Sequence, residues 1–260
     1  MCAVSYLNTV PLVWGLLHDP PEREVFDLRF ALPSVCADQL ASGEADIGIV
    51  PVIETARQNL AYFKTCGIAS YGPVRSILLI SKVPYSQIRT LATDSGSRTS
   101  VMLSRIILAE KFGCEPSVIS MAPDLASMLG AADAALLIGD AALRVDPATL
   151  PFETLDLGEQ WTNLTGLPMV FAVWAGRPEV IHEPFGETLL ASCRYGLAHM
   201  DDMVKEESRR RNFPEALVRE YLTRHIRFEF SEPHLAAIDT YLKRAAALER
   251  TVVPGGVSSL

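Results

Sequence analysis

The chain has 260 residues, of which 49% are hydrophobic and 21% charged, a composition that fits a well-packed protein of one or two domains. It contains no apolar run that approaches the length of roughly 20 residues needed to span a membrane. We also expect no secretory signal at its start. The net charge of −8 argues against nucleic acid as a partner, so an anionic ligand would need helix N-termini or a placed arginine.

Alternating and continuous apolar segments predict strands and helices joined by short connections. Strands are expected at residues 3–7, 24–30, 45–50, 74–81, 88–93, 116–121, 134–138 and 169–174. Helices are expected to begin at residues 8–9 and to occupy residues 34–43, 53–57, 101–112, 124–130, 184–199, 214–225 and 233–248. The tail at residues 254–260 is expected to be loose. Such strand–helix spacing is typical of parallel strands covered by helices on both faces.

The order of these elements predicts an α/β protein of two lobes with a ligand cleft between them. Two strand–helix units precede Ser81, two more follow it, and the strand at residues 169–174 stands alone before the terminal helices. We therefore expect the chain to cross between the lobes near Ser81 and near Met169. The first lobe would comprise residues 1–82 and 168–260, and the second lobe residues 83–167.

The five cysteines indicate the redox environment of the protein. They are widely spaced, odd in number and form no CxxC pair: Cys2, Cys36, Cys66, Cys114 and Cys193. This pattern predicts neither a zinc knuckle nor a disulfide framework. We expect buried free thiols in a reducing cytosol, and therefore a cytoplasmic protein.

The stretch at residues 5–12 joins the first strand to the first helix. Asn8 and Thr9 are good N-cap residues and Pro11 suits a first helical turn, so a plain join is one interpretation. A strand that turns directly into a helix also places Asn8 and Thr9 at the carboxyl end of a strand, where open α/β sheets bind ligands. These residues alone leave both interpretations open.

Several segments together carry a more specific signal. They are SYLNT followed by PL (residues 5–12), GEADIGIVP (43–51), VRSILL (74–79), DSGSRTS (94–100), GDAAL (139–143), and DLG, W, TGLP and FAVW between residues 156 and 174. Each is weak alone, but their order and spacing are specific. On them the chain resembles chorismate dehydratase, the first enzyme of the futalosine route to menaquinone. The resemblance runs from about residue 4 to about residue 174, with a looser match beyond.

The resemblance implies a type 2 periplasmic-binding-protein-like fold and a hydro-lyase that converts chorismate to 3-[(1-carboxyvinyl)oxy]benzoate and water, without metal or cofactor. Chorismate would be the small-molecule partner, with no nucleic acid and no membrane, and a homodimer is left open. One alternative is the sister enzyme that makes 1,4-dihydroxy-6-naphthoate, which should offer a catalytic histidine near Gly139 and Asp140. Another is a solute-binding protein that holds a small carboxylate without chemistry.

Chorismate carries two carboxylates, and fixed donors around the ring carboxylate would stabilise charge that builds up when the ring proton leaves. Hydroxyls and backbone N–H groups converge at a positive helix end in the segment formed by Ser97, Arg98, Thr99 and Ser100. Ordinary N-capping by Ser97 or Thr99 is the alternative. Arg98 can equally point to solvent or pair with an acidic residue.

With the resemblance, Asn8 and Ser76 become candidate catalytic residues: Asn8 would orient the substrate, and Ser76 would contact it near the leaving hydroxyl. Further candidate substrate contacts are Ser5, Tyr6, Thr9, Ser34, Val50, Pro51, Arg75, Gly139 and Asp140. Several have structural alternatives. Ser34 can be an N-cap, Pro51 a helix start and Ser76 a satisfied core hydroxyl. For Asp140 a helix cap is preferred, because a carboxylate beside a dianion would be repelled.

General bases are scarce in this sequence. The five histidines fall outside the expected strand ends, and neither a Ser–His–Asp order nor a metal-ligand cluster stands out. We therefore hypothesise that the enolpyruvyl carboxylate of the substrate itself takes the ring proton, an interpretation that rests on the family resemblance and on the lack of a better base.

Overall fold

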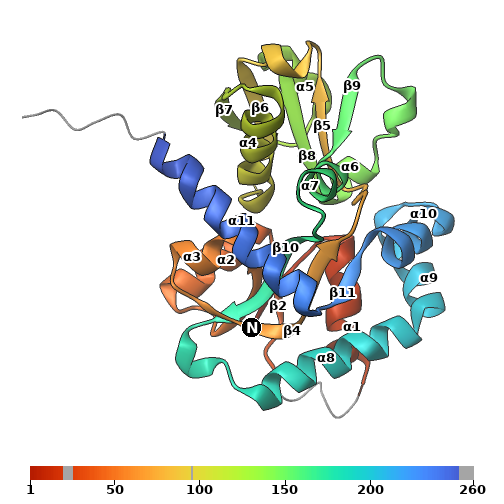
Figure 1. The fold of residues 1–260 in the computed structure, drawn as a ribbon. Helices are drawn as coiled ribbons and strands as arrows, with labels where there is room; N and C mark the ends of the chain where they lie inside the picture. Colours follow the sequence, from red (N-terminus) through yellow and green to blue (C-terminus); the bar gives the residue numbers. More distant parts are fainter. Residues whose placement is uncertain (20–25, 95, 252–260) are drawn as a thin grey trace, which may run out of the picture.

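Two β-sheets, each with its own helices, make up the computed structural model, which describes residues 1–19, 26–94 and 96–251 (Figure 1). The six-stranded sheet has the order β11-β4-β10-β3-β1-β2, and the five-stranded sheet the order β7-β6-β8-β5-β9. Ile47 lies in the first sheet and Leu136 in the second, as two separate lobes require. The predicted two-lobed α/β architecture is confirmed.

The first lobe, below in Figure 1, is built around the six-stranded sheet. Its strands are β1 (Cys2–Val4), β2 (Arg29–Ala31), β3 (Ile47–Pro51), β4 (Ala61–Ser70), β10 (Met169–Gly176) and β11 (Arg227–Glu229). Its helices are α1 (Val10–His18), α2 (Pro33–Ser42), α3 (Ile53–Arg57), α8 (Glu183–Ala198), α9 (Met200–Arg211), α10 (Glu215–Glu220) and α11 (Glu232–Thr251). A 3₁₀ turn, Leu7–Thr9, precedes α1, and a π-helical turn, Tyr221–His225, continues α10.

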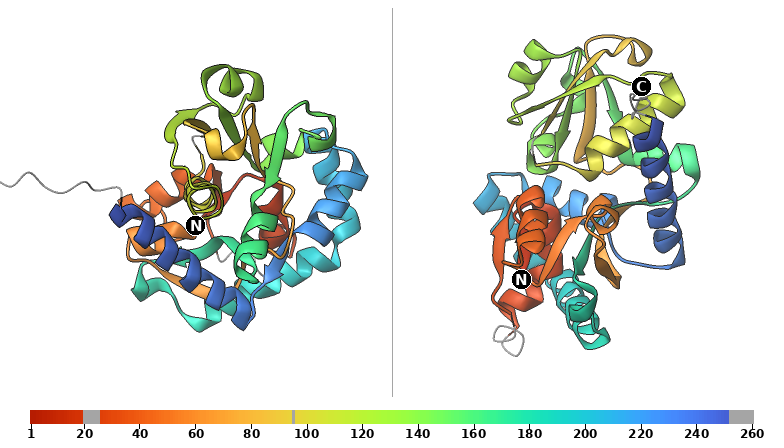
Figure 2. Two further views of the ribbon diagram at one scale, coloured as in Figure 1. Left: turned by 45° about the horizontal axis from the view of Figure 1, so that its top comes forward. Right: turned by 90° about the vertical axis from the view of Figure 1, so that its left-hand side faces the viewer.

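The second lobe is built around the five-stranded sheet. Its strands are β5 (Ile77–Ser81), β6 (Thr90–Asp94), β7 (Ser117–Met121), β8 (Ala134–Ile138) and β9 (Glu153–Asp156). Its helices are α4 (Thr99–Phe112), α5 (Leu125–Ala131), α6 (Gly139–Leu143) and α7 (Leu157–Thr165). Helix α11 runs along one side of both lobes and contacts α3 and β10 of the first and α4 of the second (Figure 2).

Whether a strand runs parallel or antiparallel to its neighbours depends on the lobe from which the chain enters it. β1 is parallel to β2 and β3, and β6 is parallel to β7 and β8, as the strand–helix spacing predicts. The strands that arrive from the other lobe run the opposite way: β10 is antiparallel to β3 and β4, and β5 to β8 and β9. Both sheets are therefore mixed rather than wholly parallel.

The first crossover lies earlier in the chain than the sequence suggested. The strand expected to close the first lobe at residue 82 is β5, and it pairs throughout with β8 and β9 of the second sheet. The chain therefore leaves the first lobe after Ser70 and enters the second at Ile77. An apolar run shows that a strand exists but not which sheet it joins. The second crossover falls between α7 and β10, where it was expected.

Several element boundaries also differ from expectation. Leu32 occupies the N-cap of α2, so the predicted cap Ser34 lies inside the first turn, whereas Gly43 ends the helix in the left-handed conformation as predicted. Helices α7 and α9 and strands β4, β9 and β11 were missed. Helix α9 buries only three residues and its sequence is largely charged. Residues 24–25 of the expected second strand and the tail at 254–260 lie outside the described residues.

The carboxylate of Asp156 holds the first crossover in place. It accepts hydrogen bonds from the backbone N–H groups of Val74 (2.9 Å) and Arg75 (2.6 Å), and it caps α7 through the N–H of Glu159 (3.1 Å). Burial raises the pKa of Asp156, and these N–H groups oppose that rise. Arg75 itself has a φ of 67°, so the link adopts a conformation that non-glycine residues seldom take.

Replacing Asp156 with alanine should lower the free energy of unfolding by about 2–4 kcal/mol, because the crossover N–H groups and the first turn of α7 lose their acceptor. Urea unfolding followed by circular dichroism would measure this. Asp124→Ala is the matched control, because Asp124 caps α5 through the N–H of Ser127. Equal losses from the two variants would contradict a special role for Asp156.

Candidate active site

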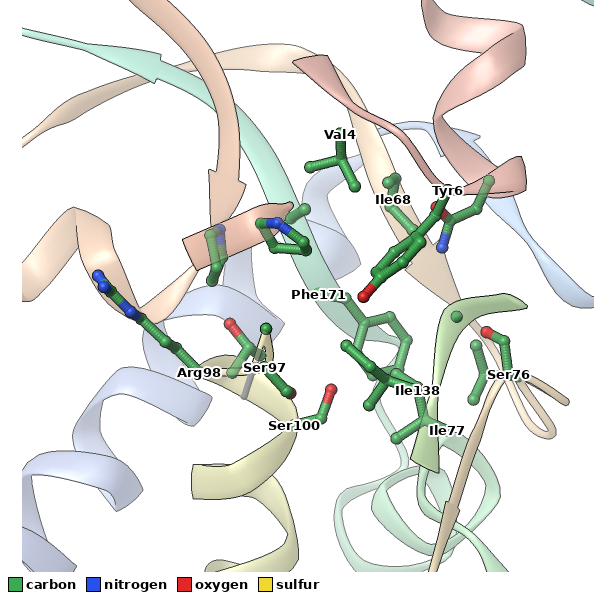
Figure 3. Close-up of a pocket in the computed structure, with 18 residues that line it drawn as sticks. Val4, Tyr6, Ile68, Ser76, Ile77, Ser97, Arg98, Ser100, Ile138 and Phe171 are labelled. Carbon is green, nitrogen blue, oxygen red and sulfur yellow. The ribbon is translucent and has the colours of Figure 1, made fainter. Parts of the chain in front are cut away.

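A cavity with about 540 Å³ of empty space, partly open to solvent, lies between the lobes (Figure 3). Its apolar walls come from both lobes and include Val4, Ile68, Ile77, Ile138 and Phe171. Polar side chains enter from a few places only, so the cavity has the character of a specific small-molecule site.

The structure divides the predicted site residues into two groups. Those that line the cavity are Tyr6, Asn8, Pro51, Ser76, Ser97, Arg98, Thr99, Ser100 and Gly139. Those that do not are Ser5, Thr9, Ser34, Val50, Arg75 and Asp140. The two groups alternate within the same motifs, because neighbouring residues at a strand end point in different directions. Val50, for example, is fully buried in β3, whereas Pro51 reaches the cavity.

The N-terminus of α4 faces the cavity through Ser97, Thr99 and Ser100. No side chain caps this helix, and its first turn holds no acidic residue. The capping role that the sequence left open for Ser97 or Thr99 is therefore not observed. Because the first N–H groups of a helix lack intrahelical partners and the helix dipole favours negative charge, this end of α4 is suited to a carboxylate.

Arg98 is directed away from the centre of the cavity in Figure 3 and forms two ion pairs. Its guanidinium lies 3.0 Å from the carboxylate of Glu54 on α3 and 2.7 Å from that of Asp38 on α2. The side chain of Glu54 is only 4% exposed. Of the alternatives for Arg98, pairing with acidic residues is the one observed, and the pairs connect the second lobe to the first.

Tyr6 projects its hydroxyl into the cavity (Figure 3). Burial raises its pKa, and the charges of Asp94 and Asp140 add to this, so Tyr6 is a neutral hydrogen-bonding group. Its ring packs against Gly139, where an added Cβ would come within 2.9 Å of the ring. Gly139 has a φ of 56°, so both space and backbone conformation favour glycine there.

Replacing Gly139 with alanine should lower kcat/KM for the substrate at least tenfold, because the new methyl group displaces the Tyr6 ring. Gly113→Ala is the matched control, since Gly113 also has a positive φ of 66° but open space around it. Both variants should lose about 1 kcal/mol of stability from backbone strain. Thermal melting measures the loss of stability, and steady-state kinetics measures the loss of activity. Equal activities of the two variants would exclude a steric role for Gly139.

Asp140 faces the first lobe rather than the cavity. One oxygen accepts the N–H of Leu7 at 3.0 Å, and the other forms an ion pair with Arg211 of α9, whose side chain is 10% exposed. The N-cap of α6 is Ile138 without a side-chain cap, so the preferred interpretation of Asp140 as a cap is not observed. Asp140 instead anchors the 3₁₀ turn that carries Asn8, and Arg211 balances its charge.

Two other residues turn away from the cavity. The guanidinium of Arg75 donates to the carbonyls of Ala142 and Val145 at 3.2 and 2.6 Å, which fastens the crossover to the end of α6. Burial lowers the pKa of Arg75, and nearby acidic groups oppose this. Thr9 is fully buried at the N-cap of α1, and its hydroxyl has no hydrogen-bond partner among the described residues.

The sequence did not indicate Tyr221, which lies beside the two candidate catalytic residues, Asn8 and Ser76. Its hydroxyl donates to the hydroxyl of Ser76 at 2.8 Å, and both residues are buried. Asn8 lies close enough to the Tyr221 hydroxyl to act on its pKa, and Oδ1 of Asn8 is buried without a partner among the described residues. No sequence signal marks Tyr221, because a tyrosine in a C-terminal helix has the pattern of an ordinary core residue.

Titrating groups around the cavity are few. Among residues 1–19, 26–94 and 96–251, no histidine lines it, and His, Cys, Asp and Glu form no group arranged to hold a metal ion. Asp94, at the end of β6, is one of the two carboxylates whose charges act on Tyr6, and burial raises the pKa of Asp94. In the same part of the chain, no helix is both long and apolar enough to cross a bilayer.

Comparison with known proteins places this chain in a family. Residues 1–247 match the family model described as menaquinone biosynthesis. The chain belongs to this family. It is also 29% identical over 246 residues to a chorismate dehydratase of Thermus thermophilus, with 88% of each chain covered.

Solved structures extend the comparison to the fold. A structural-genomics protein of Archaeoglobus fulgidus superposes with a TM-score of 0.76 at 15% identity, covering 96% of this chain and 97% of that one. The periplasmic aliphatic sulphonate binding protein of Escherichia coli superposes with a TM-score of 0.65 at 15% identity, covering 98% and 87%. The predicted periplasmic-binding-protein-like fold is confirmed.

Proposed function

We propose that this protein is a chorismate dehydratase, a hydro-lyase that converts chorismate to 3-[(1-carboxyvinyl)oxy]benzoate and water. The observation that carries the proposal is the pairing, in one cavity, of an uncapped helix N-terminus with neutral hydrogen-bonding side chains from the other lobe. The name of the Thermus thermophilus relative supports it, and so does membership of the menaquinone biosynthesis family.

The end of α4 would hold the ring carboxylate. The proton that leaves is vinylogous to this carboxylate, so negative charge that develops on the ring can spread into it. Backbone N–H groups and the hydroxyls of Ser97, Thr99 and Ser100 are fixed before the reaction and need little reorganisation, which is how such sites stabilise a transition state. They are poised where that charge would develop.

On the opposite side, Asn8 and Ser76 would hold the leaving hydroxyl. The reaction breaks the C–H bond beside the ether oxygen and the neighbouring C–OH bond. The C–H electron pair joins the aromatic ring, and the proton and hydroxide leave as water. With no histidine in the described lining, the enolpyruvyl carboxylate of chorismate is the base in this proposal.

We also propose a cytoplasmic location. All five cysteines are free, and four of them are buried. Thiols persist in this state in reducing compartments. Burial raises the pKa of Cys66 to about 12, so this thiol is held in its unreactive form.

Mass spectrometry of chorismate incubated with the purified protein tests the function. We expect a product lighter than chorismate by one water, formed only in the presence of the protein. Binding of chorismate without a change in mass would instead favour the solute-binding alternative. Absence of both binding and turnover would overturn the proposal, and would leave the naphthoate-forming sister enzyme as the next activity to assay.

A further inference from the structure

The buried Tyr221 hydroxyl joins the two residues to which the proposed function gives catalytic roles. It donates to Oγ of Ser76 at 2.8 Å; Tyr221 is 0% exposed and Ser76 1%. The backbone of Ser76 is also fixed, since its carbonyl accepts the N–H of Gly139 at 2.8 Å. Tyr221 begins a π-helical turn, a feature often found at functional sites. Its contact with Ser76 joins segments 145 residues apart in the sequence.

The direction of this hydrogen bond determines where the Ser76 proton can go. A serine hydroxyl has one proton and two lone pairs, so the Tyr221 donor occupies a lone pair and leaves the proton free. No second partner of the Ser76 hydroxyl is found among the described residues, and Ser76 lines the cavity. Its proton is therefore available to an acceptor in the cavity.

Burial keeps Tyr221 in the protonated form that this arrangement needs. Burial raises the pKa of Tyr221, and its contacts with Ser76 and Asn8 oppose that rise only in part. Oδ1 of Asn8, which lines the cavity, is buried and has no partner among the described residues, so it is an acceptor left for a ligand.

These contacts produce one donor and one acceptor beside the cavity, from Ser76 and Asn8 respectively. An alcohol that accepts one hydrogen bond and donates another fits such a pair. We propose that Tyr221 is a positioning residue that aims the Ser76 proton and the Asn8 carbonyl at the hydroxyl that leaves. This inference rests on the proposed function, because it takes the leaving hydroxyl of chorismate as the group held there.

Tyr221→Phe removes the hydroxyl and keeps the ring that fills the core. We expect kcat for chorismate to fall about 10- to 100-fold while KM changes less than about threefold, because ground-state binding depends mainly on the α4 end. A merely structural role would lower the melting temperature without this split. Ser192→Ala is the control, since it removes a buried hydroxyl that bonds Leu12 and Leu16 at the α1–α8 interface.

A double-mutant cycle with Ser76→Ala tests whether Tyr221 acts through Ser76. In the Ser76→Ala background, Tyr221→Phe should lower kcat no more than a few-fold, because residues that act as a unit are not additive. If Tyr221→Phe folds poorly, 3-fluorotyrosine at position 221 retains the donor and should retain most of the activity.

The outcomes separate the two proposals. Turnover by the wild-type protein tests the proposed function by itself. With the wild-type protein active, an unchanged kcat of Tyr221→Phe, fully additive effects in the cycle, or an inactive fluorotyrosine variant that folds normally would each overturn the positioning role of Tyr221.

Discussion

Replacing Asn8 with leucine should cut turnover of chorismate by about 10²-fold or more while the melting temperature changes little. Asn8 lines the cavity, and its Oδ1 atom has no partner among the described residues, so leucine removes an acceptor that this part of the fold does not use. Loss of an unpaired buried acceptor costs the fold little. Loss of a group that positions reacting atoms is costly, because small misplacements reduce rates steeply.

The sequence alone left open that Asn8 is a helix cap, which would predict the reverse result: about 1 kcal/mol of lost stability and normal turnover per folded molecule. In the structure the N-cap of α1 is Thr9, and no side chain caps either α1 or the 3₁₀ turn before it. Asn163→Leu, on the exposed face of α7, controls for the exchange of an amide for leucine. Turnover and melting temperature measured on the same preparation decide between the roles.

The sequence could predict what depends on local patterns. Periodicity and end signals located most strands and helices, including the Asp124 cap of α5 and the Gly43 end of α2. The sheet that a strand joins depends on distant partners, which is why β5 was placed in the wrong lobe. Helix α9 was missed because it is held by few buried residues and lacks a strong apolar face.

The candidate site likewise has a part that could be predicted from the sequence and a part that could not. The motifs at residues 8, 51, 76, 97–100 and 139 were found through the family resemblance, and most of them lie at or just after the carboxyl ends of strands that both lobes present to one cavity. The directions of long side chains could not be predicted. Arg98 and Asp140 point toward ionic partners whose positions come from helices elsewhere in the chain, and Tyr221 enters from a helix about 145 residues after Ser76.

Replacing Ser97, Thr99 and Ser100 together with alanine should raise KM for chorismate about 10²-fold or more and leave the fold intact. Hydrogen bonds to a charged group are worth roughly 1.5–3 kcal/mol each, and every 1.4 kcal/mol is about tenfold in affinity. The hydroxyls contribute little to folding. Among the described residues, only Thr99 has a side-chain partner, the N–H of Ile53 at a long 3.5 Å. Alanine also suits the first turn of α4.

Ser127→Ala is the control for this variant, because Ser127 lies in the first turn of α5, away from the cavity. Chorismate binding measured by calorimetry, together with the free energy of unfolding, distinguishes a lost anion site from a damaged helix. Part of the affinity should survive, because the backbone N–H groups at the end of α4 remain. An unchanged KM and kcat in the triple variant would place the substrate carboxylate elsewhere, and would leave the uncapped end of α4 without a role in binding.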